Sequence, residues 1–168
     1  MRIPVAVLAG SALLAALSCR DVSSPRVIDL GGRVAGWVPD SAAVLAHEDY
    51  SGFGDSTRTV VTDAGSFSAI WAQLWSGFEP KPPQPPVDFS NDVVLVVALG
   101  GRPSGGYGIT IDSVVGFSAG TVVYLTTAAP GRTCGVTDLF TQPAELVRLL
   151  QPRAPILFLE HGVVASCS

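Results

Sequence analysis

Residues 92–107 read DVVLVVALGGRPSGGY, an apolar run that leads directly into a loop rich in glycine. The seven residues 93–99 are all apolar, which is too few to cross a bilayer and suits a single β-strand. A strand that is apolar at every position has no face for water, so both of its faces need cover. We therefore predict a central strand of a sheet, covered on both sides.

The loop after this strand combines four glycines, one proline and one arginine. Glycine reaches backbone conformations closed to other residues, proline fixes one φ angle, and arginine carries a permanent charge. A rigid strand that presents a shaped loop is a common recognition device. We interpret the loop as a protein-binding site formed by Arg102, Pro103, Ser104, Gly105, Gly106 and Tyr107. The alternative is an ordinary turn stiffened by proline and glycine.

The binding interpretation gives each side chain a role. Arg102 would donate hydrogen bonds to carboxylates or carbonyls of a partner, and Ser104 would add another. The glycines would let the partner's backbone approach closely, and Tyr107 would anchor the loop or stack on the partner.

Composition limits the class of protein. The chain has 168 residues, of which 48% are hydrophobic and 14% charged, so we expect one folded domain. Its 18 glycines and 13 prolines indicate many turns between short strands. The net charge of −4 argues against a nucleic-acid partner, and the sequence shows no motif for a metal or another cofactor.

Residues 1–18 have the pattern of an export signal, with Arg2 before an apolar stretch. The stretch ends at Ser18 and Cys19, and it resembles the lipobox of bacterial lipoproteins. We therefore expect a lipid on Cys19, a tether over residues 19–40, and a single domain over residues 41–168. The protein would lie in the cell envelope, anchored by its lipid to a bacterial membrane and facing away from the cytoplasm. An ordinary secretory signal or an uncleaved anchor is the alternative.

The chain has three cysteines, Cys19, Cys134 and Cys167. Lipidation of the first leaves an even pair in an oxidising compartment, so we predict a disulfide between Cys134 and Cys167. It would close a loop of about 34 residues and contribute roughly 2–4 kcal/mol. Two separate thiols remain the alternative, and a metal pair is disfavoured because no CxxC motif or nearby histidine accompanies them.

One amphipathic helix is predicted over about residues 64–76. Its apolar residues Phe67, Ile70, Trp71, Leu74 and Trp75 recur at helical spacing. Asp63 or Ser66 would cap its start. The proline-rich residues 79–87 would then form an extended connector to the central strand.

The remaining pattern indicates short strands. Residues 42–47 would form an edge strand and pair with residues 57–62 as a hairpin, and residues 107–112 and 121–127 would form a meander. Residues 136–141 and 156–159 could be further strands, while residues 143–150 suit either a short helix or a strand. The fold class is therefore α+β, a mostly antiparallel sheet or sandwich of five to seven strands with one helix packed on it.

Residues 116–120 fit the G-x-S-x-G pattern of a hydrolase nucleophile at Ser118, and Asp138 and His161 follow in hydrolase order. That nucleophile sits between a strand and a helix. Here the residues after Gly120 have the pattern of a strand, so a small hydrolase is the least favoured interpretation and we expect no enzyme.

Several of these elements together resemble a known family. They are residues 67–71 (FSAIW), 87–90 (VDFS), 101–107 (GRPSGGY), 134–137 (CGVT) and 141–143 (TQP). They resemble the carboxy-terminal domain of the protease-complex subunit PrcB over roughly residues 42–160. The resemblance implies an exported, non-catalytic accessory or stabilising partner of a protease outside the cytoplasm. Residues 102–107 also resemble, over a few positions, the loop with which chagasin-type inhibitors enter protease clefts, so a protease inhibitor is the alternative.

Overall fold

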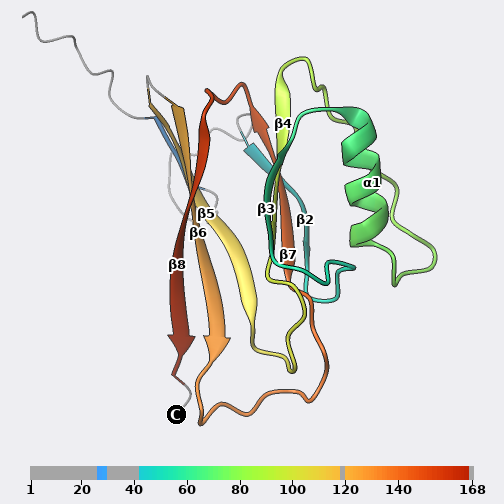
Figure 1. Ribbon diagram of the computed structural model, residues 1–168, viewed down its shortest axis with the longest axis vertical. Helices are drawn as coiled ribbons and strands as arrows, with labels where there is room; N and C mark the ends of the chain where they lie inside the picture. Colours follow the sequence, from blue (N-terminus) through green and yellow to red (C-terminus); the bar gives the residue numbers. More distant parts are fainter. Residues whose placement is uncertain (1–25, 30–41, 118–119, 167–168) are drawn as a thin grey trace, which may run out of the picture.

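Two β-sheets pack face to face, and a helix covers the outer face of one of them (Figure 1). This computed structural model describes residues 26–29, 42–117 and 120–166. Cys19, Ser118, Cys167 and most of the predicted signal and tether lie outside the described residues. The predicted class, a mostly antiparallel β-sandwich with one helix, is confirmed.

The first sheet has the strand order β1-β5-β6-β8. Its strands are β1 (Arg26–Asp29), β5 (Gly108–Phe117), β6 (Gly120–Pro130) and β8 (Ile156–Ala165). β5 pairs antiparallel with β1 and β6, as the predicted meander requires, whereas β6 and β8 run parallel. β1 lies within the stretch predicted as a tether.

The second sheet has the order β2-β7-β4-β3 and is antiparallel throughout. Its strands are β2 (Ala42–Glu48), β7 (Ala144–Leu150), β4 (Asp92–Ala98) and β3 (Thr57–Val61). The predicted hairpin of residues 42–47 and 57–62 is wrong, because β2 and β3 lie at opposite edges of this sheet. Residues 143–150 were left open as helix or strand, and residues 144–150 form the inner strand β7. Its apolar residues before Leu150 are buried on both faces of the sheet.

β4 is the predicted central strand. Val94, Val96 and Ala98 face the core beneath the helix, while Leu95 and Val97 face the core between the two sheets. All five side chains are fully buried. The uninterrupted apolar run therefore reflects cover on both faces, as the sequence predicted.

The helix α1 (Ala64–Leu74) begins at the predicted N-cap, because Asp63 Oδ1 accepts a hydrogen bond of 2.8 Å from the backbone N–H of Ser66. Phe67, Trp71 and Leu74 bury one face of the helix against the second sheet. The indole Nε1 of Trp71 donates to the carbonyl of Pro82 at 3.0 Å. The proline-rich connector is therefore fastened to the helix that it follows.

A buried carboxylate links the two sheets. Glu145 on β7 is 4% exposed, and its Oε2 accepts a hydrogen bond of 2.5 Å from the backbone N–H of Ile111 on β5. Its Oε1 lies 3.1 Å from Nδ1 of His47 on β2. The register of β5 shifts between Ile111 and Ser113, and such a bulge leaves an extra residue without a ladder partner. Glu145 thus supplies an acceptor where the first sheet is irregular.

Candidate functional site

Three connections meet at one end of the sandwich (Figure 1). The glycine loop (residues 100–107) passes from β4 to β5, and the β6–β7 connection (residues 131–143) passes between the sheets in the opposite direction. The third connection (residues 49–56) joins β2 to β3. It bonds to both others, because Gly101 N–H donates to the Gly54 carbonyl at 3.0 Å and Gln142 N–H donates to the Asp49 carbonyl at 2.8 Å.

The glycine loop is held against the β6–β7 connection by backbone hydrogen bonds. Arg102 and Thr141 exchange two of them, at 2.7 and 3.0 Å. Gly105 N–H donates to the Thr137 carbonyl at 2.9 Å, and the Thr141 hydroxyl donates to the Ser104 carbonyl at 2.9 Å. The glycine loop and the β6–β7 connection therefore form two layers at this end of the sandwich. Residues 136–140 of the connection form an irregular segment that covers the loop. The strand considered for residues 136–141 is wrong, since only Thr141 makes a bridge, to Arg102.

The glycines of the loop are needed for this internal contact. A Cβ atom on Gly101 would lie 2.5 Å from Cζ of Phe140, and one on Gly105 would overlap Oγ1 of Thr137. Gly106 has a φ of +83°, and its Cβ would lie 3.0 Å from Cγ1 of Val136. The sequence analysis expected these glycines to let a partner's backbone come close. In the folded chain they let the β6–β7 connection of the same chain come close.

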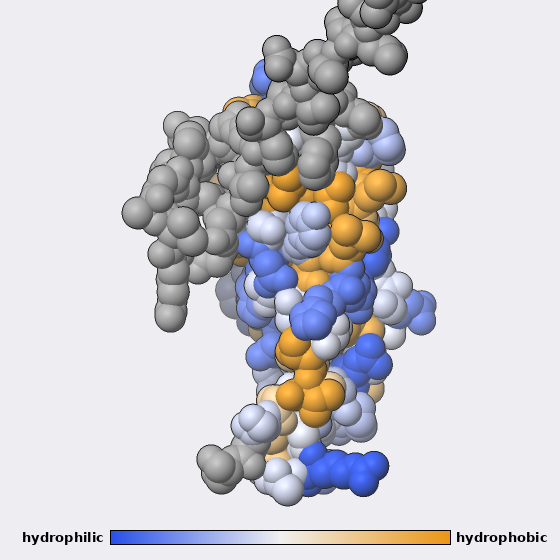
Figure 2. All heavy atoms as spheres, turned by 90° about the vertical axis from the view of Figure 1, so that its left-hand side faces the viewer, coloured by the Kyte–Doolittle hydropathy of each residue, from blue (hydrophilic) through white to orange (hydrophobic). Residues whose placement is uncertain are grey.

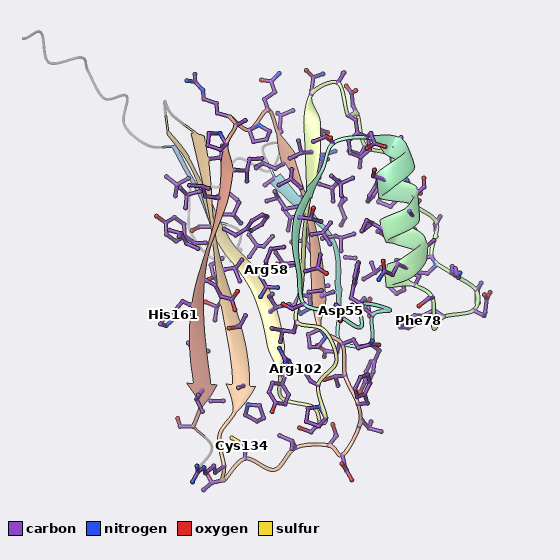
Figure 3. The ribbon with its side chains drawn as sticks, viewed as in Figure 1. Asp55, Arg58, Phe78, Arg102, Cys134 and His161 are labelled. Atoms are coloured by element: carbon purple, nitrogen blue, oxygen red, sulfur yellow. The ribbon has the colours of Figure 1, made fainter. Side chains whose placement is uncertain are left out.

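Arg102 is also engaged within the chain. Its Nη2 donates to the carbonyl of Leu99 at 3.0 Å, and its guanidinium carbon lies 5.8 Å from the centre of the Tyr107 ring, within the range of a cation–π contact. Arg102 and Tyr107 are both half-buried, whereas Pro103 and Gly106 are exposed. Figure 3 shows Arg102 at the end of the sandwich that carries the connections. Arg102 and Tyr107 thus brace the loop, and Pro103 and Gly106 are its outermost residues.

The β6–β7 connection presents large apolar side chains that the sequence interpretation did not assign to a site. Val136, Leu139 and Phe140 are 42%, 54% and 62% exposed, and Tyr50 on the neighbouring connection is 49% exposed. We call these four residues the end patch. The sequence does show these apolar residues, but the sequence analysis considered residues 136–141 as a further strand. Their position between Gly135 and the Gln142–Pro143 pair indicates a loop.

The predicted cysteine pair concerns this same end. Sγ of Cys134 lies 3.5 Å from the backbone carbonyl of Ala165, two residues before Cys167. Figure 3 shows Cys134 near the lower end of β8. Since Cys167 lies outside the described residues, the disulfide stays a prediction, as does lipidation of Cys19.

The residues considered for hydrolysis do not have the expected setting. Ser118 lies outside the described residues, and the chain continues from Gly120 into the strand β6 instead of a helix. Asp138 lies on the β6–β7 connection and His161 on β8. Within residues 26–29, 42–117 and 120–166, no cluster of three or more His, Cys, Asp or Glu side chains could hold a metal ion. No helix in this part of the chain is both long and apolar enough to cross a membrane.

One family model matches part of the chain. Residues 93–149 match the family model described as PrcB C-terminal. The match runs from β4 to β7 and includes the glycine loop and the β6–β7 connection, which are the two layers of the end described above. No curated protein and no solved structure matches the chain.

Proposed function

From the match of residues 93–149 to the PrcB C-terminal family model, we propose that the protein is a non-catalytic binding module. It would be exported, anchored to a bacterial membrane by a lipid on Cys19, and act as an accessory or stabilising partner of a protease outside the cytoplasm. The contact would be made by the end patch together with Pro103 and Gly106 of the glycine loop.

The observation that carries this proposal is the exposure of the end patch on a rigid support. Large apolar side chains on a flexible loop lose conformational entropy on binding, whereas those on a braced segment lose less. Backbone hydrogen bonds with Arg102 and Gly105, and the bond from the Thr141 hydroxyl to the Ser104 carbonyl, fix the β6–β7 connection before any partner arrives. A few residues supply most of the binding energy at protein interfaces, and aromatic side chains such as Phe140 and Tyr50 are enriched there.

The support also revises the roles of the loop residues. The Arg102 side chain donates to Leu99, and the Ser104 hydroxyl donates to the carbonyl of Gly105 at 3.2 Å. Both act chiefly on the shape of the loop, so their replacement would weaken binding indirectly. Phe140, which lies over Gly101 and keeps 62% of its surface exposed, is the residue we expect to contact the partner directly.

The test is crosslinking and affinity capture of the full-length protein from its native envelope. Replacing Leu139 and Phe140 together by serine should abolish capture of a protease identified by mass spectrometry, with the thermal melt nearly unchanged. The matched control is Val44→Ser, because Val44 is 49% exposed on β2, outside the connections that form this end, and it should leave capture intact. Equal capture by all three proteins, or capture of partners that include no protease, would contradict the proposal.

Rate measurements distinguish the accessory role from the inhibitor. An inhibitor slows the purified protease that has been captured, whereas an accessory partner changes the maturation or stability of the protease in cells and leaves its rate unchanged. Cys19→Ala separates anchoring from binding. It should release the protein from membranes while capture in solution persists, and retention on salt-washed membranes would contradict the lipid anchor.

A further inference from the structure

β8 is an open edge of the first sheet without the usual protection. It runs over ten residues, and among the described residues its only strand partner is β6. Natural edge strands are commonly short or carry lysine or proline, which discourages pairing with another chain. β8 contains neither residue, and Leu157, Leu159, Val163 and Val164 are between 38% and 73% exposed.

The register with β6 assigns each residue of β8 to a face. Phe158 and Glu160 pair with Val123 and Leu125, whose side chains are buried between the sheets. Because side chains alternate along a strand, the outer face carries Leu157, Leu159, His161, Val163 and Ala165. Figure 3 shows His161 pointing away from the sandwich, and Figure 2 shows hydrophobic residues gathered on this side of the molecule.

We propose that β8 pairs antiparallel with β8 of a second copy of this chain, about a twofold axis through His161. Antiparallel pairing joins the two edges by ladder hydrogen bonds, and the two first sheets would become one continuous sheet. The proposal is independent of the end patch, because it uses only the edge and faces of β8.

The register follows from the side chains. A twofold axis perpendicular to the sheet keeps every side chain on its own face. Residues opposite each other in an antiparallel pair share a face, so the axis must set one residue opposite its own copy. An axis through Glu160 would set two carboxylates opposite each other, which is unfavourable. An axis through His161 sets Leu159 opposite Val163 and Leu157 opposite Ala165 on the outer face. An axis further from the strand centre shortens the paired segment.

The inner face is compatible with the same register. Phe158 would lie opposite Val164, which is 73% exposed in the single chain. Glu160 would lie opposite Gly162, which has no side chain to crowd it. The Glu160 carboxylate is already paired, since Arg58 on β3 donates to its Oε2 through Nε at 3.1 Å and Nη2 at 2.8 Å. An inward charge would ordinarily guard this edge, but here a cation of the same chain balances it.

Cysteine crosslinking in the native envelope tests the register with the full-length protein. In His161→Cys the two introduced thiols would face each other, with Cα atoms about 4.5–5.5 Å apart, within the range that a disulfide spans. Mild oxidation should convert this variant to a dimer that dithiothreitol reverses. Leu159→Cys is the matched control, because the two positions would be four residues and about 14 Å apart at about 3.4 Å per residue, and it should stay monomeric on a non-reducing gel.

Two further samples complete the experiment. The unaltered chain reports any dimer formed through its native cysteines, and the double variant Leu159→Cys with Val163→Cys should crosslink again, since these positions face each other. Equal crosslinking of His161→Cys and Leu159→Cys, or none in either, would overturn the proposal. Leu159→Lys should also remove the dimer in sedimentation of the purified protein, whereas Val44→Lys should not. A monomeric unaltered protein in that experiment would likewise overturn it.

Discussion

Removing the Glu145 carboxylate should destabilise the sandwich more than any change at an exposed acid. Glu145→Ala deletes the acceptor of the Ile111 N–H, a hydrogen bond of 2.5 Å that crosses from β7 to β5. The donor would stay buried, because Ile111 is 1% exposed.

The magnitude follows from three terms. Loss of a hydrogen bond to a charged acceptor costs about 1.5–3 kcal/mol, and this includes the unsatisfied donor. The one methylene group that is lost, Cγ, adds about 0.8 kcal/mol. The contact with His47 contributes little, because that side chain is 48% exposed and solvent screens it. We therefore expect Glu145→Ala to cost roughly 2–4 kcal/mol.

Glu145→Gln is the informative companion. Its amide oxygen can still accept from Ile111, so only the charge is lost and the cost should be about 1 kcal/mol. Glu79→Ala, which truncates an exposed glutamate, should stay within about 0.5 kcal/mol.

Urea unfolding followed by tryptophan fluorescence measures all three variants, since Trp71 and Trp75 are buried in the core. The midpoint should fall while the denaturant slope stays constant. If Glu145→Ala cost no more than Glu145→Gln, the bond to Ile111 would not hold the sheets together and the reasoning would be refuted.

Three further predictions concern other parts of the molecule. The hydrogen bond to its carboxylate partner raises the pKa of His47 above 6.5, so the contribution of His47 to stability is fully present below pH 6.5 and is lost as the pH rises through the folded-state pKa. The urea midpoint of His47→Gln should therefore differ from that of the unaltered protein more at about pH 5.5 than at about pH 8, which lie on either side of the ordinary pKa of histidine. An equal difference at the two pH values would contradict the contact. Gly106→Ala should cost about 1–2 kcal/mol because of its positive φ angle, whereas a Cβ on Gly135 meets no atom within 4 Å, so Gly135→Ala should cost less in the same assay. Non-reducing mass spectrometry should find Cys134 joined to Cys167, and thiol labelling of both in the native protein would exclude that bond.

Most elements of the fold could be predicted because their signals are local. The apolar run of β4, the helical spacing of Phe67, Trp71 and Leu74, and the Asp63 cap all lie within short stretches of sequence. The alternating residues of β5 and β6 and their short connection also identified a meander. Burial and capping depend on the residue type and its near neighbours, so such patterns predict the elements themselves.

The pairing of strands was harder to predict from the sequence. β2 and β3 are close in sequence and were predicted to pair, yet each pairs with a strand that occurs later in the chain, β7 for β2 and β4 for β3. A sheet is formed by contacts between distant segments, and strand propensity does not specify the partner. The glycine loop could be recognised for the same local reasons as β4, but its contact with the β6–β7 connection could not.

By itself, the sequence determined that this chain has a central buried strand, one capped helix and a stiff glycine loop, because hydrophobic period and backbone preference are properties of short segments. Only the tertiary structure decided what the loop touches. It turns Arg102 onto Leu99 and Tyr107, lays residues 136–140 over the glycines, and leaves Leu139 and Phe140 exposed. The contacts between the glycines and residues 136–140 join positions 30 or more residues apart, and which of two apolar segments becomes buried depends on the space that the rest of the fold leaves open.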